Sequence, residues 1–251
     1  MFSIIDGVPY ARLFDYFHNE KGEPQKIVWY RDAAYVGLFL EYIGRTDLIE
    51  TFAANIHELY DQNRDVKEPD NLGQILYLQS LVKNKNNDLI KAIVEEADRI
   101  KDAEGNLTGT TDGSRSSAYQ NGWLIFGLER LGLREEAAKF NRHSQIDDNG
   151  YSRLLWFTLP QNGIKQNTAW RDWDPTRLKI SANSRYTNVE NQPFPYINIG
   201  KDHFAMRSGT NYKNPVLTQV AYPITWGDGT RPHIWHSVEL FMYCAEFQER
   251  K

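Results

Sequence analysis

The chain has few of the features that mark several large classes of protein. It has one cysteine, Cys244, among 251 residues, so it can form neither an internal disulfide framework nor a zinc site built on thiolates. No apolar run reaches the length that spans a membrane. The N-terminus lacks the basic and then apolar order of a signal peptide. We therefore expect a cytoplasmic protein, with its one cysteine acting as a small buried hydrophobe.

The charge pattern excludes further partners. The net charge is -4 and no basic stripe occurs along the chain, which argues against a general nucleic-acid binder. Neither common glycine-rich phosphate loop is present, and neither is a G-x-S-x-G elbow that would present a nucleophilic serine. We therefore expect no cofactor, no metal and no nucleic-acid or membrane partner.

Aromatic side chains are what the chain has in quantity, with 7 tryptophans and 14 tyrosines. Large rings can fill a thick core. They also provide faces on which a planar ligand or a sugar ring can stack. The composition leaves both interpretations open.

Charge-poor segments alternate with amphipathic segments in the first 144 residues. The charge-poor segments predict helices that are buried on all sides, because they have no solvent face. The amphipathic segments predict helices with one wet face. The charge-poor helices are expected at 29–44, 70–82 and 116–133, and the amphipathic helices at 47–61, 88–102 and 134–144.

The alternation is an internal repeat that can be checked by register. Leu40, Leu81 and Leu128 each stand seven residues before an acidic residue. Each unit is therefore predicted to be a helical hairpin, with an inner helix followed by an outer one. Such a hairpin cannot bury its apolar face alone and must stack on its neighbours.

Stacked hairpins could form an open solenoid, but the unequal loops favour a closed (α/α) toroid with a pocket. In a ring of this kind the inner helices run parallel, so their N-terminal ends meet at one mouth. The loops before them, at 25–31, 61–71 and 102–120, are long and rich in polar and aromatic residues. We expect the functional face at this mouth.

The regular pattern ends near residue 145. Residues 145–220 are expected to be largely loop or irregular. Residues 161–201 predict one long loop, and a loop of that length is functional or disordered. Its tryptophan, phenylalanine and tyrosine content argues against disorder. We expect one all-α domain over residues 1–251, with three clear hairpins and long irregular loops in its C-terminal half.

Four motifs at the expected helix starts carry a resemblance to a known superfamily. They are WYRDA at 29–33, EPDN at 68–71, GTTDGSRSSAYQN at 109–121 and TWGDGTRPHIWH at 225–236. With the hairpin ring, they resemble the six-hairpin glycosidase-like proteins, which include unsaturated-uronyl hydrolases and related glycoside hydrolases. The resemblance covers roughly residues 25–143 and 220–249. It implies a carbohydrate substrate, acidic catalysts on the mouth loops, and Trp, His and Arg side chains that grip the sugar.

Three carboxylates are the catalytic candidates: Asp70, Asp112 and Asp32. Asp70 follows Pro69 at the start of the second inner helix, where its plainer role is to cap that helix. Asp112 stands between two glycines in the loop before the third inner helix, where an ordinary turn is the alternative. Asp32 lies one turn into the first inner helix, where an ion pair with a neighbouring arginine would explain it as well. Asp70 and Asp112 are the expected pair, and Asp32 could replace either.

Arginine, tryptophan and histidine side chains are the candidates for sugar binding. The crowded stretch 225–236 supplies most of them, and its two histidines at i and i+3 fit sugar hydroxyls better than a metal ion. The expected substrate-binding residues are Trp226, Trp235, His233, His236, Arg115, Arg231 and Trp173. Glu41 lies inside an inner helix, where Arg45 at i+4 is the expected partner.

The function that these predictions favour is glycoside hydrolysis of an oligosaccharide or a uronic-acid-containing glycan by two carboxylates. Two alternatives remain open. One is a sugar epimerase or polysaccharide lyase that uses histidine or tyrosine as a base. The other is a carbohydrate-binding protein without catalysis.

Overall fold

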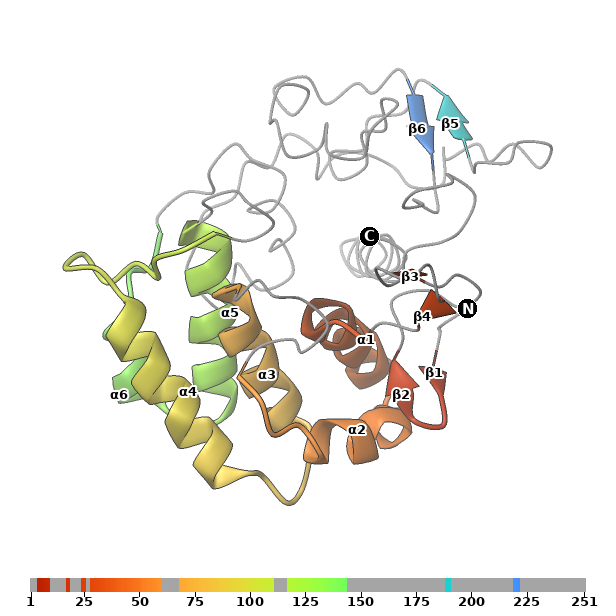
Figure 1. Cartoon of the computed structure of the whole chain (residues 1–251), viewed down its shortest axis with the longest axis horizontal. Coiled ribbons are helices and arrows are strands. Elements are labelled where there is room, and N and C mark those ends of the chain that lie inside the picture. Colours follow the sequence, from red (N-terminus) through yellow and green to blue (C-terminus); the bar gives the residue numbers. More distant parts are fainter. Residues whose placement is uncertain are drawn as a thin grey trace, which may run out of the picture.

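The computed structural model describes residues 4–9, 17–18, 24–25, 28–59, 68–110, 117–143, 188–190 and 219–221. This part of the chain is mostly helical, as the sequence predicts (Figure 1). The helices are α1 (Tyr30–Tyr42), the 3-10 helix η1 (Thr46–Ile49), α2 (Glu50–Ala54), α3 (Asp70–Ser80), α4 (Asn87–Ile100), α5 (Ser117–Arg130) and α6 (Arg134–Ala137).

Short strands complete the described elements and form three antiparallel pairs. They are β1 (Ile4–Ile5) with β2 (Val8–Pro9), β3 (Phe17–His18) with β4 (Pro24–Gln25), and β5 (Asn188–Glu190) with β6 (Gln219–Ala221). The last pair falls in or next to the stretch 145–220 that we expected to be irregular. The remainder of that stretch lies outside the described residues.

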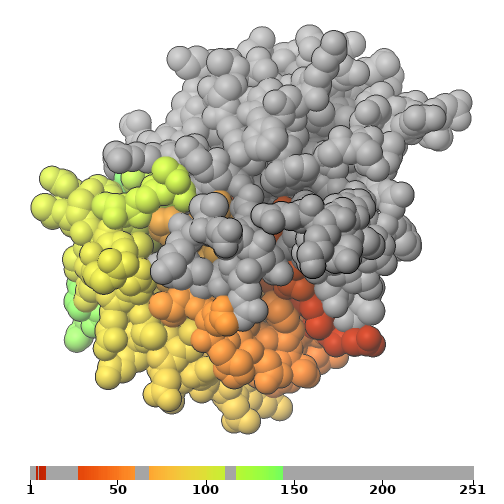
Figure 2. All heavy atoms as spheres, viewed as in Figure 1, coloured from red at the N-terminus to blue at the C-terminus, as the bar shows by residue number. Residues whose placement is uncertain are grey.

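The three charge-poor helices are the buried ones. Ten of the 13 residues of α1, ten of the 11 of α3 and eleven of the 14 of α5 are buried. In α4, by contrast, the buried residues are Leu89, Ile93 and Ala97, spaced four apart along one face. This is the difference between a helix with neighbours all round and a helix with one wet face. Among the coloured residues of Figure 2, α4 and the η1–α2 segment form much of the visible surface.

The inner helices α1, α3 and α5 run parallel, with α3 between the other two (Figure 1). Two hydrogen bonds show this direction for α1 and α3. Arg31 binds Asp70 near the first residues of both helices, and Glu41 binds Tyr77 near their last residues. Helices α3 and α5 approach most closely at two glycines. A Cβ on Gly73 would overlap the backbone of Trp123 and Leu124, and one on Gly127 would lie 2.6 Å from the Gly73 carbonyl oxygen.

Two inner helices end in the same way, which supports the repeat register. Gly44 after α1 and Gly132 after α5 both have positive φ, 71° and 80°. In each case the glycine N–H bonds back three residues and the next N–H bonds back five, to Leu40 and Leu128. This is the Schellman motif, in which glycine takes the left-handed conformation without a Cβ penalty. The two leucines are the residues that the repeat places in register.

The outer helix of the first hairpin is much shorter than the predicted range 47–61. It begins as the 3-10 turn η1, and α2 then ends at Ala54. Amide side chains from the second hairpin bind the carbonyl groups at and beyond this end: Gln79 Nε2 bonds to Ala53 O at 2.6 Å, and Asn86 Nδ2 to Ile56 O at 3.5 Å. Leu48, in η1, is 38% exposed.

The outer helix of the third hairpin was also predicted too long. Helix α6 has four residues, whereas the pattern suggested 134–144. Beyond it the chain leaves helical geometry to pair with another loop, because Asn141 N donates to Gly105 O at 2.9 Å. The outer helix of the second hairpin, α4, agrees with its prediction to within two residues at each end.

Candidate functional site

Charged side chains are buried together at the N-terminal ends of α1 and α3. Arg31 and Asp32 belong to the first turn of α1, Glu68 precedes α3, and Asp70 is its first residue. Their exposed fractions are 4%, 0%, 3% and 0%, and they are the only charged residues in the buried part of the described chain. Burying charge is costly unless the groups are paired and hydrogen-bonded. The N-terminal ends of the inner helices are therefore the place where the described part of the chain buries its charged side chains.

Arg31 joins the two acidic residues that flank Pro69. Its Nη2 atom donates to Glu68 Oε2 at 2.6 Å, and its Nε atom donates to Asp70 Oδ2 at 3.0 Å. Both side-chain pairs are almost completely shielded from solvent. Ion pairs of this kind fix geometry, because each hydrogen bond is charge-assisted and the guanidinium plane is rigid. The pairing holds the start of α3 against the start of α1.

Asp70 does not cap α3, so its plainer predicted role is wrong. Pro69 occupies the N-cap position, and Asp70 lies inside the first turn. The Asp70 side chain faces Arg31 and also accepts a hydrogen bond from Gln74 Nε2 at 2.7 Å, one turn along α3. The Asp70 carboxylate thus joins side chains of α1 and α3.

The network continues from α3 to α5 through Gln74 and Tyr119. Gln74 Nε2 lies 3.5 Å from Tyr119 Oη, and both side chains are fully buried. Burial raises the pKa of the Tyr119 phenol well above its usual value; the Arg31 charge opposes this, and the Asp70 charge adds to it. Tyr119 is therefore a neutral phenol at physiological pH. Next to it, Tyr35 and Trp123 pack edge to face with ring centroids 5.7 Å apart.

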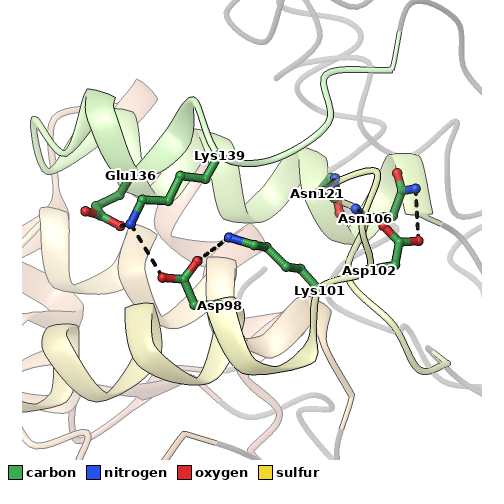
Figure 3. Close-up of polar contacts among 8 residues, drawn as sticks. Asp98, Lys101, Asp102, Asn106, Asn121, Glu136 and Lys139 are labelled. Atoms are coloured by element: carbon green, nitrogen blue, oxygen red, sulfur yellow. Dashed lines mark hydrogen bonds and ion pairs between the residues drawn. The ribbon is translucent and has the colours of Figure 1, made fainter.

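Asn121 of α5 binds the loop between α4 and α5, and Figure 3 labels it beside Asp102 and Asn106 of that loop. Asn121 Oδ1 accepts from Leu107 N at 2.9 Å, and its Nδ2 donates to Gly105 O and Asn141 O at 2.9 and 3.0 Å. The side chain thus uses its acceptor and both donors on three backbone groups. It holds the loop at Gly105 and Leu107 and ties it to Asn141.

The same loop also touches the start of α3. Gly109 has φ 108°, and a Cβ on it would lie 2.9 Å from Pro69 Cγ, between Glu68 and Asp70 in sequence. Gln120 Nε2 lies 3.5 Å from Gly109 O. The start of α1, the start of α3 and the loop before α5 are therefore linked by contacts at this end of the helices.

The structure describes two of the predicted site residues. Asp32 and Asp70 lie at the same end of the parallel inner helices and are fully buried. The other predicted residues lie outside the described residues: Asp112, Arg115, Trp173, Trp226, Arg231, His233, Trp235 and His236.

Sequence reasoning missed the side chains that connect the carboxylates. Gln74 and Tyr119 were not singled out, and Arg31 was considered only as a local partner of Asp32. A signal was present, because Asp70 and Gln74 stand four apart in a helix that has no charged residue besides Asp70. Such a pair shares one face of the helix.

The predicted pairing of Glu41 with Arg45 is wrong. Glu41 accepts a hydrogen bond from Tyr77 Oη at 3.0 Å and forms an ion pair with Arg130 of α5. Arg45 instead binds Asp47 at 2.9 Å in an exposed pair. Gly44 turns the chain out of the helix before Arg45, so the i, i+4 neighbourhood of a continuous helix does not exist there.

Among the described residues, no group of three or more His, Cys, Asp or Glu side chains could hold a metal ion. None of the helices described is long and apolar enough to cross a membrane. The chain matches no family model, no curated protein and no solved structure with which it was compared.

Proposed function

We propose that the protein is a glycoside hydrolase that acts on an oligosaccharide or a uronic-acid-containing glycan. One observation carries the proposal: Glu68 and Asp70 are buried and bound to Arg31, and a third carboxylate, Asp32, is buried at the same end of the parallel, charge-poor helices. Glycoside hydrolysis uses a pair of positioned carboxyl groups that flank the scissile bond.

The architecture that fits this function is an (α/α) toroid. Three hairpins in register, with inner helices that run parallel, support it. The rest of the chain would complete the ring within a single domain of 251 residues. The mouth loops would then surround a cavity into which a sugar chain enters.

In the proposed mechanism one carboxyl group protonates the leaving oxygen, and a second activates water or attacks the anomeric carbon. Asp70 and Asp112 are the proposed pair, with Asp32 as the replacement for either. Arg31 and Gln74 position Asp70 by binding its Oδ2 atom. Arg115, Trp173, Trp226, Arg231, His233, Trp235 and His236 remain the proposed sugar-binding residues.

The pKa shifts of two tyrosines argue against either of them as the base of a lyase or epimerase. Burial raises the pKa values of Tyr77 and Tyr119 well above the usual value, so neither phenol gives up its proton readily. A base for proton abstraction needs a pKa close to the working pH.

The test is turnover of a panel of neutral and uronic-acid oligosaccharides, followed by the appearance of reducing ends. Asp70→Asn should lower kcat by about 10²-fold or more while sugar binding is retained. Glu68→Gln is the matched control, because it removes the other carboxylate that binds Arg31; it should affect folding stability more than turnover. Unchanged turnover in both Asp70→Asn and Asp32→Asn would overturn the assignment. Formation of unsaturated uronides would indicate a lyase, and binding without product would indicate a carbohydrate-binding protein.

A further inference from the structure

A pocket of about 420 Å³ lies beside α2, away from the buried carboxylates. It is formed where the β1–β2 hairpin, the start of α1, helix α2 and the residues after α2 meet. Its volume is within the range of small-molecule sites. None of Asp32, Glu68 and Asp70 lines it.

The walls of this pocket are partly aromatic. Tyr30 and Phe52 line it together with Val8, Val28 and Ile56. Tyr30 and Ile56 are buried and Phe52 is half-buried, so these side chains are held by the core. The combination of rings and branched aliphatic groups suits the apolar face of a ligand ring.

The polar part of the lining mixes hydrogen-bond donors with acceptors. Thr51, Asn55 and His57 can both donate and accept, and Asp6 and Glu58 provide carboxylate oxygens. A hydroxyl group donates one hydrogen bond and accepts others, so it matches a mixed set of this kind. Among the described residues that line the pocket there is no lysine or arginine, which argues against phosphate, uronate and other anions.

The backbone of the hairpin presents Asp6 at the pocket. Asp6 and Gly7 both have positive φ, 52° and 78°, between two antiparallel strands. This is the geometry of a two-residue type I′ turn, which Asp-Gly sequences favour. Asn also tolerates this conformation, so Asp6→Asn can remove the charge and leave the turn intact.

We propose that this pocket binds one uncharged sugar unit of a carbohydrate, at a site separate from the buried carboxylates. The aromatic and aliphatic lining would contact the apolar face of the sugar ring, and the mixed polar residues would bind its hydroxyl groups. Tyr30 immediately precedes Arg31, so the site adjoins the start of α1 while using a different face of it.

The first test is direct binding of cellobiose, maltose and xylobiose, measured by NMR titration and calorimetry. Digalacturonate serves as the anionic comparison and choline as the cationic one. At least one neutral disaccharide should bind, and more tightly than digalacturonate or choline. Failure of all three neutral disaccharides to bind, or tighter binding of choline or digalacturonate, would overturn the proposal.

The second test locates the binding and separates hydroxyl recognition from charge recognition. Phe52→Leu keeps an apolar side chain but removes the ring, and should weaken disaccharide binding about three- to tenfold. Asp6→Asn with Glu58→Gln should change it by less than about threefold, because the amides still form hydrogen bonds. Glu95→Gln on the exposed face of α4 is the matched control and should have no effect. Equal affinity for the wild type and Phe52→Leu would refute the site.

This outcome is independent of the proposed hydrolase activity. Binding at the pocket does not use Asp70, so Asp70→Asn should retain it. Loss of turnover in Asp70→Asn concerns the catalytic proposal, whereas loss of binding in Phe52→Leu concerns this site.

Discussion

At the N-terminal ends of the inner helices, Arg31 and its two acidic partners have side chains that are at most 5% exposed. At the C-terminal ends, Arg130 and Glu41 also join two inner helices by an ion pair, but their side chains are 38% and 34% exposed. The two ends belong to the same parallel helices and use the same kinds of residue. They differ in whether water reaches the charges.

This difference bears on function because of what burial costs. An exposed ion pair costs little and stabilises little, whereas a buried one must recover a desolvation penalty of several kcal/mol for each ion. Apolar side chains could hold α1 against α3 without that penalty. Folding alone therefore does not require Arg31, Glu68 and Asp70 at the N-terminal ends of α1 and α3, and the proposed catalytic role would account for them.

Replacing each arginine by methionine tests the comparison directly and should give the largest effect. Arg31→Met leaves Glu68 and Asp70 buried without their shared guanidinium, and should cost about 3–5 kcal/mol of unfolding free energy. Arg130→Met should cost about 1 kcal/mol or less. Urea denaturation followed by circular dichroism measures both values. Similar costs at the two ends would contradict the distinction.

A smaller loss of unfolding free energy is expected from a substitution at the close contact of α3 and α5, between the two ends of the inner helices. Gly73→Ala would push a Cβ into the backbone of Trp123 and Leu124, and should cost about 3 kcal/mol. Gly37→Ala is the matched control in α1. Its Cβ would meet only the side-chain atoms Leu81 Cδ1 at 3.0 Å and Tyr77 Cε1 at 3.2 Å, which can move. If thermal unfolding showed Gly37→Ala to be the more harmful change, the close contact of α3 and α5 would not be the main constraint.

The position of the inner helices could be predicted from the sequence because the signals for them are local. Lack of charge marked α1, α3 and α5, and Pro69, Gly44 and Gly132 marked a start and two ends. The lengths of α2 and α6 could not be predicted in this way. The amides that bind the carbonyl groups near the end of α2, Gln79 and Asn86, come from 26 and 30 residues further along the chain.

The contacts of the charged side chains could likewise be predicted only where they depend on neighbouring residues in the sequence. Parallel inner helices imply that Asp32 and Asp70 lie at one end, and this part of the site was predicted. The partners were not, because Arg31 reaches across 39 residues to Asp70 and Tyr77 reaches across 36 to Glu41. Spacing within one helix suggested Arg45 for Glu41, but the turn at Gly44 removes that contact.

Loss of the Asn121 hydrogen bonds to the loop between α4 and α5 should have a moderate effect on stability. Asn121→Ala leaves Leu107 N–H and the carbonyl groups of Gly105 and Asn141 without this partner, and should cost about 1–2 kcal/mol. Hydrogen exchange at the Leu107 amide should accelerate by more than the global loss of stability explains. Asn84→Ala, at an exposed position, is the control and should change stability by about 0.5 kcal/mol or less. Unchanged exchange at Leu107 would show that the loop is held by other contacts.

The smallest effect is expected from Arg45 and Asp47, an exposed ion pair beyond the C-terminal end of α1. The Arg45 side chain donates two hydrogen bonds to Asp47 and lowers the pKa of that carboxyl group below its usual value. A lowered pKa in the folded state means that the pair stabilises the fold above the unfolded pKa and loses that effect as the pH falls through the folded one.

Because both side chains are more than half exposed, solvent screens this pair, and Asp47→Asn should lower the melting temperature by about 1 °C or less at neutral pH. The difference should vanish in acid and in concentrated salt. Arg45→Gln and the double variant complete a cycle that isolates the pairwise contribution. A melting temperature lowered as much as in Arg31→Met would mean that exposure does not decide what an ion pair contributes here, and the contrast between the two ends would then lose its physical basis.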